Sequence, residues 1–238
     1  MQKTSRQLAL LKEKQRYNLP LEISKIEQIK LDLNYPIQKI IGYVSMQNVD
    51  IYLDQKVFIP RYETEELLLL AYDLIDQNSK VLDIGCGSGF IAIAIAKNKK
   101  ATVSAIDIDI SAIIQTQLNA KINDVEIEVI QSDLFTKLDN RKFDLIISNP
   151  PYLKKVPLDD SVVNFEPNIA FFGEPKAYSF YQKIIDQGLP YLSQGGSFLF
   201  EIDQDSYDFF KNHKLDFKIL KDINNKTRFA IYTLAKKL

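Results

Sequence analysis

The residues of this chain best suited to chemistry are Asn149, Pro150, Pro151 and Tyr152, which follow the apolar run 145–148. A strand cannot continue through two prolines, because each proline lacks an N–H and has a fixed φ. The side-chain oxygen of Asn149 and the carbonyl of Pro150 are hydrogen-bond acceptors, and Pro151 keeps the preceding residue extended. Tyr152 offers a flat face. Together these groups suit the binding of a planar NH₂ group through both of its hydrogens.

The same tetrapeptide also has a purely structural interpretation, because N-P and P-P pairs commonly end strands and begin turns. The elements that precede it decide between the two. From residue 80 onward, apolar segments of strand length alternate with helical patterns, which predicts a parallel sheet covered by helices on both faces. The tetrapeptide then stands at the carboxyl end of the fourth strand, at the edge where open α/β sheets bind ligands.

The predicted fold is α/β: a doubly wound, Rossmann-like, mostly parallel sheet with an antiparallel hairpin at one edge. Strands are predicted at 80–85, 101–108, 125–135, 143–151 and 195–202, an antiparallel pair at 216–223 and 227–234, and helices at 89–98, 110–121, 177–191 and 204–213. Upstream, we expect helices at 7–16 and 23–31, a β-hairpin within 40–58 that turns at Gln47 and Asn48, and a helix over 63–75 capped by Thr64. This gives a short helical N-terminal region at 1–35, a linker and small β-hairpin at 36–62, and the main domain at 63–238.

The composition is that of a globular protein, with 46% hydrophobic and 26% charged residues. The 30 basic and 31 acidic side chains nearly cancel, so no direct contact with nucleic acid is expected. One Cys and one His cannot form a disulfide or a structural zinc site, so we expect no metal and a reducing compartment. No apolar run reaches the roughly 20 residues of a membrane span. We therefore expect a cytoplasmic, monomeric protein.

The segment VLDIGCGSGF combines an acid with a glycine-rich turn. Asp83 ends the first strand of the alternating series, and Gly85, Gly87 and Gly89 occupy the turn into the helix, where backbone can approach a ligand because side chains are absent. A phosphate-binding G-x-G-x-x-G turn would need glycine at position 90, which is Phe90. The turn therefore lacks this phosphate-binding pattern, and it also lacks the G-K-[ST] of a P-loop.

Two further acids end the next two strands of the series. Asp107 stands where a carboxylate can accept hydrogen bonds from both hydroxyls of a ribose. Asp133 stands where it could accept from an adenine amine, with Leu134 against the ring. An Asp after a strand is also an ordinary turn or cap residue. The ordered series after a glycine-rich turn favours a nucleoside site.

Residues 80–150 resemble the class I S-adenosylmethionine-dependent methyltransferases. In that family the glycine-rich turn holds the methionine part of the cofactor, the acid after the second strand holds the ribose, and an Asp in the third loop meets the adenine. The resemblance implies S-adenosylmethionine as cofactor and S-adenosylhomocysteine as product, with these contacts: Asp83, Gly85, Cys86, Gly87, Ser88, Gly89, Asp107, Asp133, Leu134 and Asn149. Cys86 is interpreted as a small loop residue, because no His lies beside it to activate a thiol.

With that cofactor, the tetrapeptide suits in-line methyl transfer to nitrogen. The lone pair of a conjugated NH₂ group is delocalised, and two acceptors orient that group and stabilise its developing positive charge. The tetrapeptide matches the [DNS]-P-P-[YFW] motif of amino-methyltransferases, which implies catalytic roles for Asn149, Pro150 and Tyr152 and a substrate contact for Pro151. The motif does not identify the nitrogen that is methylated.

The segment FIPRYETEELL, 58–68, resembles an element that precedes the catalytic domain in the PrmC/HemK family of glutamine N5-methyltransferases. The segments PIQKIIGYV, FEPNIAFFG and LSQGGSFLFEI resemble further elements of that family. The family methylates the glutamine of the Gly-Gly-Gln loop in peptide chain release factors, so the resemblance implies those factors as partners. We hypothesise that Arg61, Thr64 and Glu65 line the cofactor or glutamine pocket.

The chain departs from this family in two places. Only residues 1–35 precede the first matching element, where the family has a larger helical domain that grips the release factor. At the C-terminus, NNKTRFAIY replaces the usual GrdRvv pattern, and Arg228 matches its Arg without an assigned role.

Two other functions stay open at this point. One is an exocyclic-amine methyltransferase acting on adenine or guanine in RNA or DNA, which uses the same tetrapeptide on a flipped base. The other is a catalytically silent scaffold that binds the cofactor and contacts the translation machinery.

Overall fold

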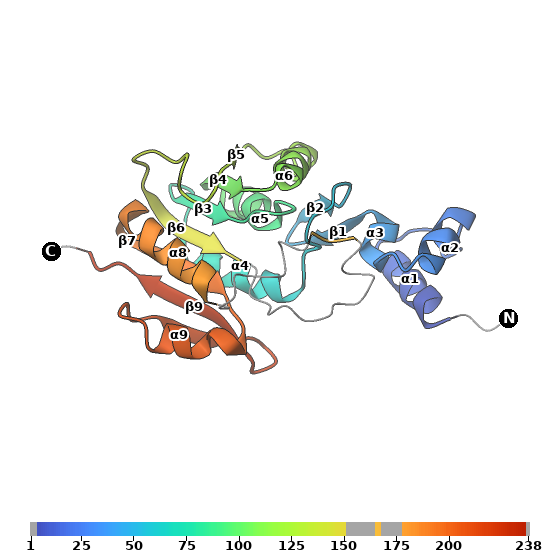
Figure 1. Cartoon of the computed structure of the whole chain (residues 1–238). Coiled ribbons are helices and arrows are strands. Elements are labelled where there is room, and N and C mark those ends of the chain that lie inside the picture. The colour runs from blue at the N-terminus through green and yellow to red at the C-terminus, as the bar shows by residue number, and fades with distance from the viewer. Residues whose placement is uncertain (1–3, 151–164, 168–177, 237–238) are drawn as a thin grey trace.

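The computed structural model describes residues 4–150, 165–167 and 178–236 (Figure 1). The chain begins with three helices, α1 (Ser5–Arg16), α2 (Lys25–Asp32) and α3 (Ile37–Ile41). Capping boxes formed by Thr4 and Ser24 fix the starts of α1 and α2. The three helices pack around a small cluster of their own: Leu10, Leu31 and Ile40. The two helices predicted here are confirmed, whereas α3 was not predicted.

A two-stranded hairpin follows, formed by β1 (Tyr43–Met46) and β2 (Val49–Tyr52). Gln47 and Asn48 both have positive φ, 50° and 61°, as a two-residue turn of type I′ requires. The structure thus confirms the predicted hairpin and its turn.

The main sheet has the order β5-β4-β3-β6-β7-β9-β8. Its first five strands are parallel, and β9 lies antiparallel between β7 and β8. The strands are β3 (Lys80–Ile84), β4 (Thr102–Asp107), β5 (Glu128–Gln131), β6 (Phe143–Ser148), β7 (Leu192–Glu201), β8 (Lys218–Lys221) and β9 (Thr227–Thr233). The predicted parallel series and antiparallel edge pair are both confirmed.

Helices cover both faces of this sheet (Figure 1). They are α4 (Glu63–Leu74), α5 (Phe90–Lys99), α6 (Ile110–Ile122), α8 (Ser179–Gly188) and α9 (Tyr207–Lys211), with short 3₁₀ turns at Leu189–Tyr191 and Gln204–Ser206. None of the helices in the described part of the chain has the length and apolar character needed to cross a bilayer.

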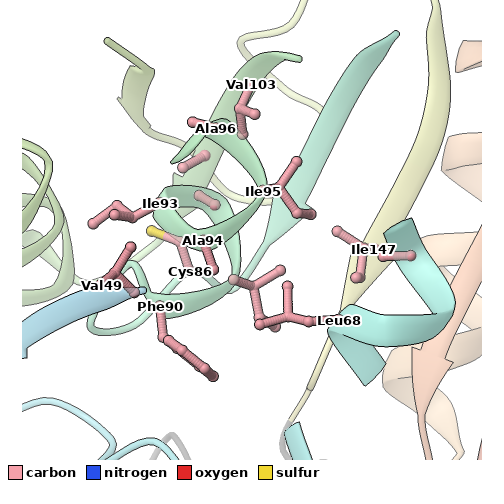
Figure 2. Close-up of a cluster of buried hydrophobic side chains, with 14 of the residues drawn as sticks. Val49, Leu68, Cys86, Phe90, Ile93, Ala94, Ile95, Ala96, Val103 and Ile147 are labelled. Carbon is pink, nitrogen blue, oxygen red and sulfur yellow. The ribbon is translucent and has the colours of Figure 1, made fainter. Parts of the chain in front are cut away.

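Alternate residues of each central strand enter two separate cores. Val81 and Ile147 face α4, α5 and the hairpin, whereas Leu82 and Ile146 face α8 and α9. Helix α5 is buried from Phe90 through Ala96, because it is enclosed by the sheet, by Leu68 of α4 and by Val49 of the hairpin (Figure 2). The alternating Ile and Ala residues of α5 therefore pack on all sides of the helix.

A stripe of amide side chains on α6 and at its C-cap binds the hairpin and the segment that follows it. The stripe consists of Gln115, Asn119 and Asn123, which lie four residues apart and therefore share one side of the helix. The amide of Asn119 accepts from the N–H of Tyr52 at 3.0 Å and donates to the Tyr52 carbonyl at 3.0 Å. It also donates to the carbonyl of Ser88 at 2.9 Å, which connects the hairpin to the glycine-rich turn.

Candidate active site

The glycine-rich turn joins β3 to α5 with three residues of positive φ: 74° at Gly85, 55° at Gly87 and 84° at Gly89. A Cβ atom built on Gly85 would meet nothing within 4 Å, and one on Gly87 would meet only the Gly85 carbonyl at 4.0 Å. A Cβ on Gly89 would lie 2.9 Å from the side chain of Thr116 on α6. The first two glycines thus leave open backbone, and the third permits close packing of α5 and α6.

Asp107, at the end of β4, lies against this turn. One carboxylate oxygen accepts from the N–H of Gly87 at 3.0 Å and the other from the N–H of Asp109 at 2.9 Å. Burial raises the pKa of Asp107, although these two backbone donors oppose the shift. An acidic acceptor therefore stands beside open backbone.

The third loop lies next to the second. The N–H of Ser132 donates to the carbonyl of Asp107 at 2.9 Å, which places the residues after β5 beside the end of β4. Asp133 is exposed, whereas Leu134 is buried and has a positive φ of 46°. The structure thus brings together the ends of β3, β4 and β5, where Asp133 is exposed, Asp107 is half-buried and the apolar Leu134 is buried.

Asp83 lies beneath the turn. Its side chain is fully buried, and one oxygen accepts from the N–H of Ala92 in α5 at 3.2 Å. The other oxygen has no hydrogen-bond partner among the described residues. Burial, with a smaller contribution from the charge of Asp107, raises the pKa of Asp83 to about 7. Asp83 therefore faces the first turn of α5 from inside the protein.

Cys86 also points inward. Its sulfur lies within the apolar cluster around α5 (Figure 2), 3.4 Å from the hydroxyl oxygen of Thr116. Burial raises the pKa of this thiol, which disfavours the nucleophilic thiolate. The geometry agrees with its interpretation as a small loop residue.

The end of β6 adjoins the glycine-rich turn. The hydroxyl of Ser148 donates to the carbonyl of Ile84 at 2.7 Å, and Ile84 immediately precedes Gly85. Asn149 is half-buried and Pro150 is buried, and both follow Ser148 directly. Pro151 and Tyr152 lie outside the described residues. The first half of the tetrapeptide is thus beside the turn that leaves open backbone.

Thr64 contacts Asn149 from α4. The side-chain nitrogen of Asn149 donates to the hydroxyl oxygen of Thr64 at 3.3 Å, and that hydroxyl donates to a carboxylate oxygen of Glu201 at 2.9 Å. The prediction that Thr64 caps α4 is wrong. The helix begins at Glu63, with Tyr62 at the N-cap position. The Thr64 side chain points into the protein, where its hydroxyl donates a hydrogen bond to the buried carboxylate of Glu201.

Arg61 and Glu65 engage partners other than Asn149. The Arg61 guanidinium forms an ion pair of 2.7 Å with Glu166, whose second oxygen accepts from the N–H of Ile59 at 2.8 Å. Glu65 accepts from the side chain of Gln47 at 3.4 Å. Of the three residues that the sequence grouped with the pocket, Thr64 is therefore the one that is hydrogen-bonded to Asn149 in the described part of the chain.

Two buried carboxylates near the site had no assigned role on sequence, Glu166 and Glu201. Glu166 stands in FEP and Glu201 in FLFEI, so each is a charged residue type next to apolar ones. That contrast was the signal in the sequence that could have pointed to a buried carboxylate. Arg228, in β9, forms an ion pair of 3.2 Å with Asp222 in the β8–β9 connection.

Comparisons with known proteins find related methyltransferases. A protein-family model described as "Methyltransferase small domain" matches residues 63–165. A Lactococcus lactis protein named "Release factor glutamine methyltransferase" is 39% identical over 203 residues, which cover 82% of this chain and 73% of that protein. A protein of the same name from Flavobacterium psychrophilum is 39% identical, and the match covers 74% of this chain and 66% of that protein. Another, from Streptococcus pneumoniae, is 36% identical, and the match covers 73% of this chain and 63% of that protein.

Solved structures show the same fold at lower identity. A methyltransferase from Pyrococcus furiosus gives a TM-score of 0.60 at 16% identity, covering 89% of this chain and 100% of that one. An RNA methyltransferase from Salinibacter ruber, solved with S-adenosyl-L-homocysteine, gives 0.53 at 20% identity, covering 76% of this chain and 96% of that one.

Proposed function

This chain belongs to the family of release factor glutamine methyltransferases, and we propose that it methylates the glutamine of the Gly-Gly-Gln loop in peptide chain release factors. The acceptor atom is the side-chain amide nitrogen, N5. One observation carries the proposal: in a chain with such relatives, the Ser148 to Ile84 hydrogen bond holds Asn149 beside the open glycine-rich turn.

The residues around that turn fit S-adenosylmethionine. Gly85 and Gly87 leave backbone uncovered, Asp107 offers acceptor oxygens suited to ribose hydroxyls, and Asp133 and Leu134 supply an acceptor and an apolar contact for a base. Bound there, the cofactor would supply an electrophilic methyl group on a sulfonium. We propose that the buried Asp83 and Cys86 shape the turn from beneath rather than contact the cofactor.

The acceptors at the end of β6 would prepare the glutamine nitrogen. Each hydrogen of the side-chain NH₂ group is held by one oxygen, the side-chain oxygen of Asn149 or the carbonyl of Pro150. Held in this way, the nitrogen can become tetrahedral, and the two oxygens stabilise the positive charge that develops on it. The amide proton then leaves to water. Tyr152 would pack against the planar amide, and Pro151 would keep the Pro150 carbonyl extended.

We propose that the N-terminal region is a docking surface for the release factor. Helices α1 and α2 carry exposed large apolar side chains: Leu8, Ile26 and Ile29, followed by Leu33 at the end of α2. Exposed apolar patches of this kind mark interaction sites. Because release factors act in translation, we also propose that the enzyme works in the cytoplasm, as a monomer.

The test is incubation of the purified protein with labelled S-adenosylmethionine and a purified release factor, followed by mass mapping of the modified peptide. We expect one methyl group on the glutamine of the Gly-Gly-Gln loop. A release factor with that glutamine changed to alanine is the matched control and should take up no label at the loop. Label on RNA or DNA with none on the release factor would contradict the proposal.

A further inference from the structure

We propose that Glu201 is a positioning residue for methyl transfer, which acts through the hydroxyl of Thr64 to fix the direction in which the side-chain amide of Asn149 faces. The proposal deepens the function proposed above and rests on it, because it concerns Asn149 at the end of β6. Glu201 itself is separated from the substrate by two side chains.

The three side chains come together from three elements that are distant in sequence. Strands β6 and β7 are parallel neighbours with Ser148 opposite Phe200, so Asn149 and Glu201 leave adjacent strand ends side by side. Thr64, in the first turn of α4, lies between them, 3.3 Å from the Asn149 nitrogen and 2.9 Å from a Glu201 oxygen. Thr64 is 3% exposed and Glu201 is 2% exposed, so bulk water does not compete for these bonds.

The direction of these hydrogen bonds follows from which groups carry a hydrogen to donate. The Thr64 hydroxyl has a single hydrogen, which it donates to a carboxylate oxygen of Glu201. Toward Asn149 the same hydroxyl can then only accept. The Asn149 atom that faces Thr64 must therefore be the donor nitrogen, and the acceptor oxygen lies on the other side of the amide.

That orientation is the one methyl transfer requires. The amide of Asn149 can bind a substrate NH₂ group only through its oxygen, because two NH₂ groups facing each other are both donors. A flipped Asn149 would have nearly the same shape and no catalytic contact. Glu201 accepts the one hydrogen that the Thr64 hydroxyl can donate, and this selects one of two otherwise similar orientations of the Asn149 amide.

Four variants test the proposal in the methyltransfer assay. Glu201→Gln keeps the size but can donate to Thr64, and Thr64→Val keeps the shape but removes the hydroxyl. We expect each to lower kcat about 10- to 100-fold, with the affinity for S-adenosylmethionine unchanged. Thr64→Ser restores the hydroxyl and should recover most of the kcat that Thr64→Val loses. Ser197→Ala is the matched control, because it removes a buried hydroxyl from β7, bonded to Thr233, without touching Asn149.

A second measurement does not depend on activity. In protein labelled with ¹⁵N-asparagine, the side-chain NH₂ signals of Asn149, assigned with Asn149→Asp, should shift in Glu201→Gln and Thr64→Val. They should stay in place in Ser197→Ala. If the signals respond in this way but no release factor is methylated, the proposed function fails and the positioning role stands. The inference would be overturned if the signals and kcat stayed unchanged in Glu201→Gln and Thr64→Val. It would also be overturned if each of these two variants lost cofactor affinity, thermal stability and kcat to the same extent.

Discussion

Arg61 and Glu166, 105 residues apart in the chain, form an ion pair of 2.7 Å whose carboxylate is almost completely buried. The Glu166 carboxylate also accepts from the N–H of Ile59, so it holds the segment before α4 at two points. Glu166 belongs to the short described segment 165–167, which follows Asn149 and Pro150 in the sequence. This pair therefore joins the segment before α4 to the chain after Asn149.

Removing Arg61 should destabilise the protein. Arg61→Met leaves Glu166 buried with one of its partners missing, and we expect a loss of about 1–3 kcal/mol in the free energy of unfolding. Urea unfolding at pH 7 measures it. The control is Arg141→Met, which breaks the exposed pair with Glu128 and should cost less than about 1 kcal/mol. Equal effects of the two substitutions would contradict the role given to Arg61.

Asn149→Ala should separate catalysis from cofactor binding. The substitution removes one of the two oxygens that hold the glutamine NH₂ group, so kcat should fall by about 100- to 1,000-fold. The dissociation constant for S-adenosylmethionine, measured by calorimetry, should change little by comparison. Equal losses in both quantities would mean that Asn149 serves the cofactor rather than the glutamine.

Asp83 should make the cofactor-free protein less stable as the pH rises. Its pKa lies at about 7 in the folded protein against an ordinary value of 3.8 for an Asp side chain, so the folded state holds the proton more tightly than the unfolded chain. This contribution to the free energy of unfolding is fully present below about pH 4 and is lost as the pH rises through about 7. Asp83→Asn should remove that loss, as urea unfolding between these pH values would show. Asp73→Asn, at an exposed site of α4, should leave the slope unchanged.

The apolar side chains of α2 should govern the affinity for the protein substrate. Ile26→Asp combined with Ile29→Asp places charges on the proposed docking surface, and we expect a KM for the release factor about tenfold higher with kcat unchanged. The control is Ile223→Asp, at an exposed side chain in the β8–β9 connection. An equal rise in KM for both variants would exclude a specific role of α2.

The fold was largely predictable from sequence because its determinants are local. The alternation of apolar strands and helices gave the parallel sheet, and the Gln47 and Asn48 turn gave the hairpin. The contacts that complete the site are long-range: Thr64 meets Glu201 across 137 residues. A local pattern could not show that Thr64 turns inward, since Thr near a helix start is an ordinary cap.

The amide stripe of α6 escaped sequence analysis for a related reason. Gln115, Asn119 and Asn123 have the spacing of one helix side, and polar residues with that spacing usually face solvent. Their partners in β2 and in the loop that follows it are backbone groups at least 60 residues earlier in the chain. Only the folded chain shows that these amides are buried against the hairpin.

This stripe also protects the protein from unwanted association. An isolated two-stranded hairpin presents unpaired N–H and C=O groups along its edges, which can recruit a strand from another molecule. Here Asn119 and Asn123 satisfy the outward backbone groups of Tyr52 and Asp50 in β2, and the Tyr17 hydroxyl accepts from the N–H of Ser45 in β1. The side chains of two helices thereby deny these backbone groups to a foreign strand, and the hairpin is guarded against edge-to-edge aggregation.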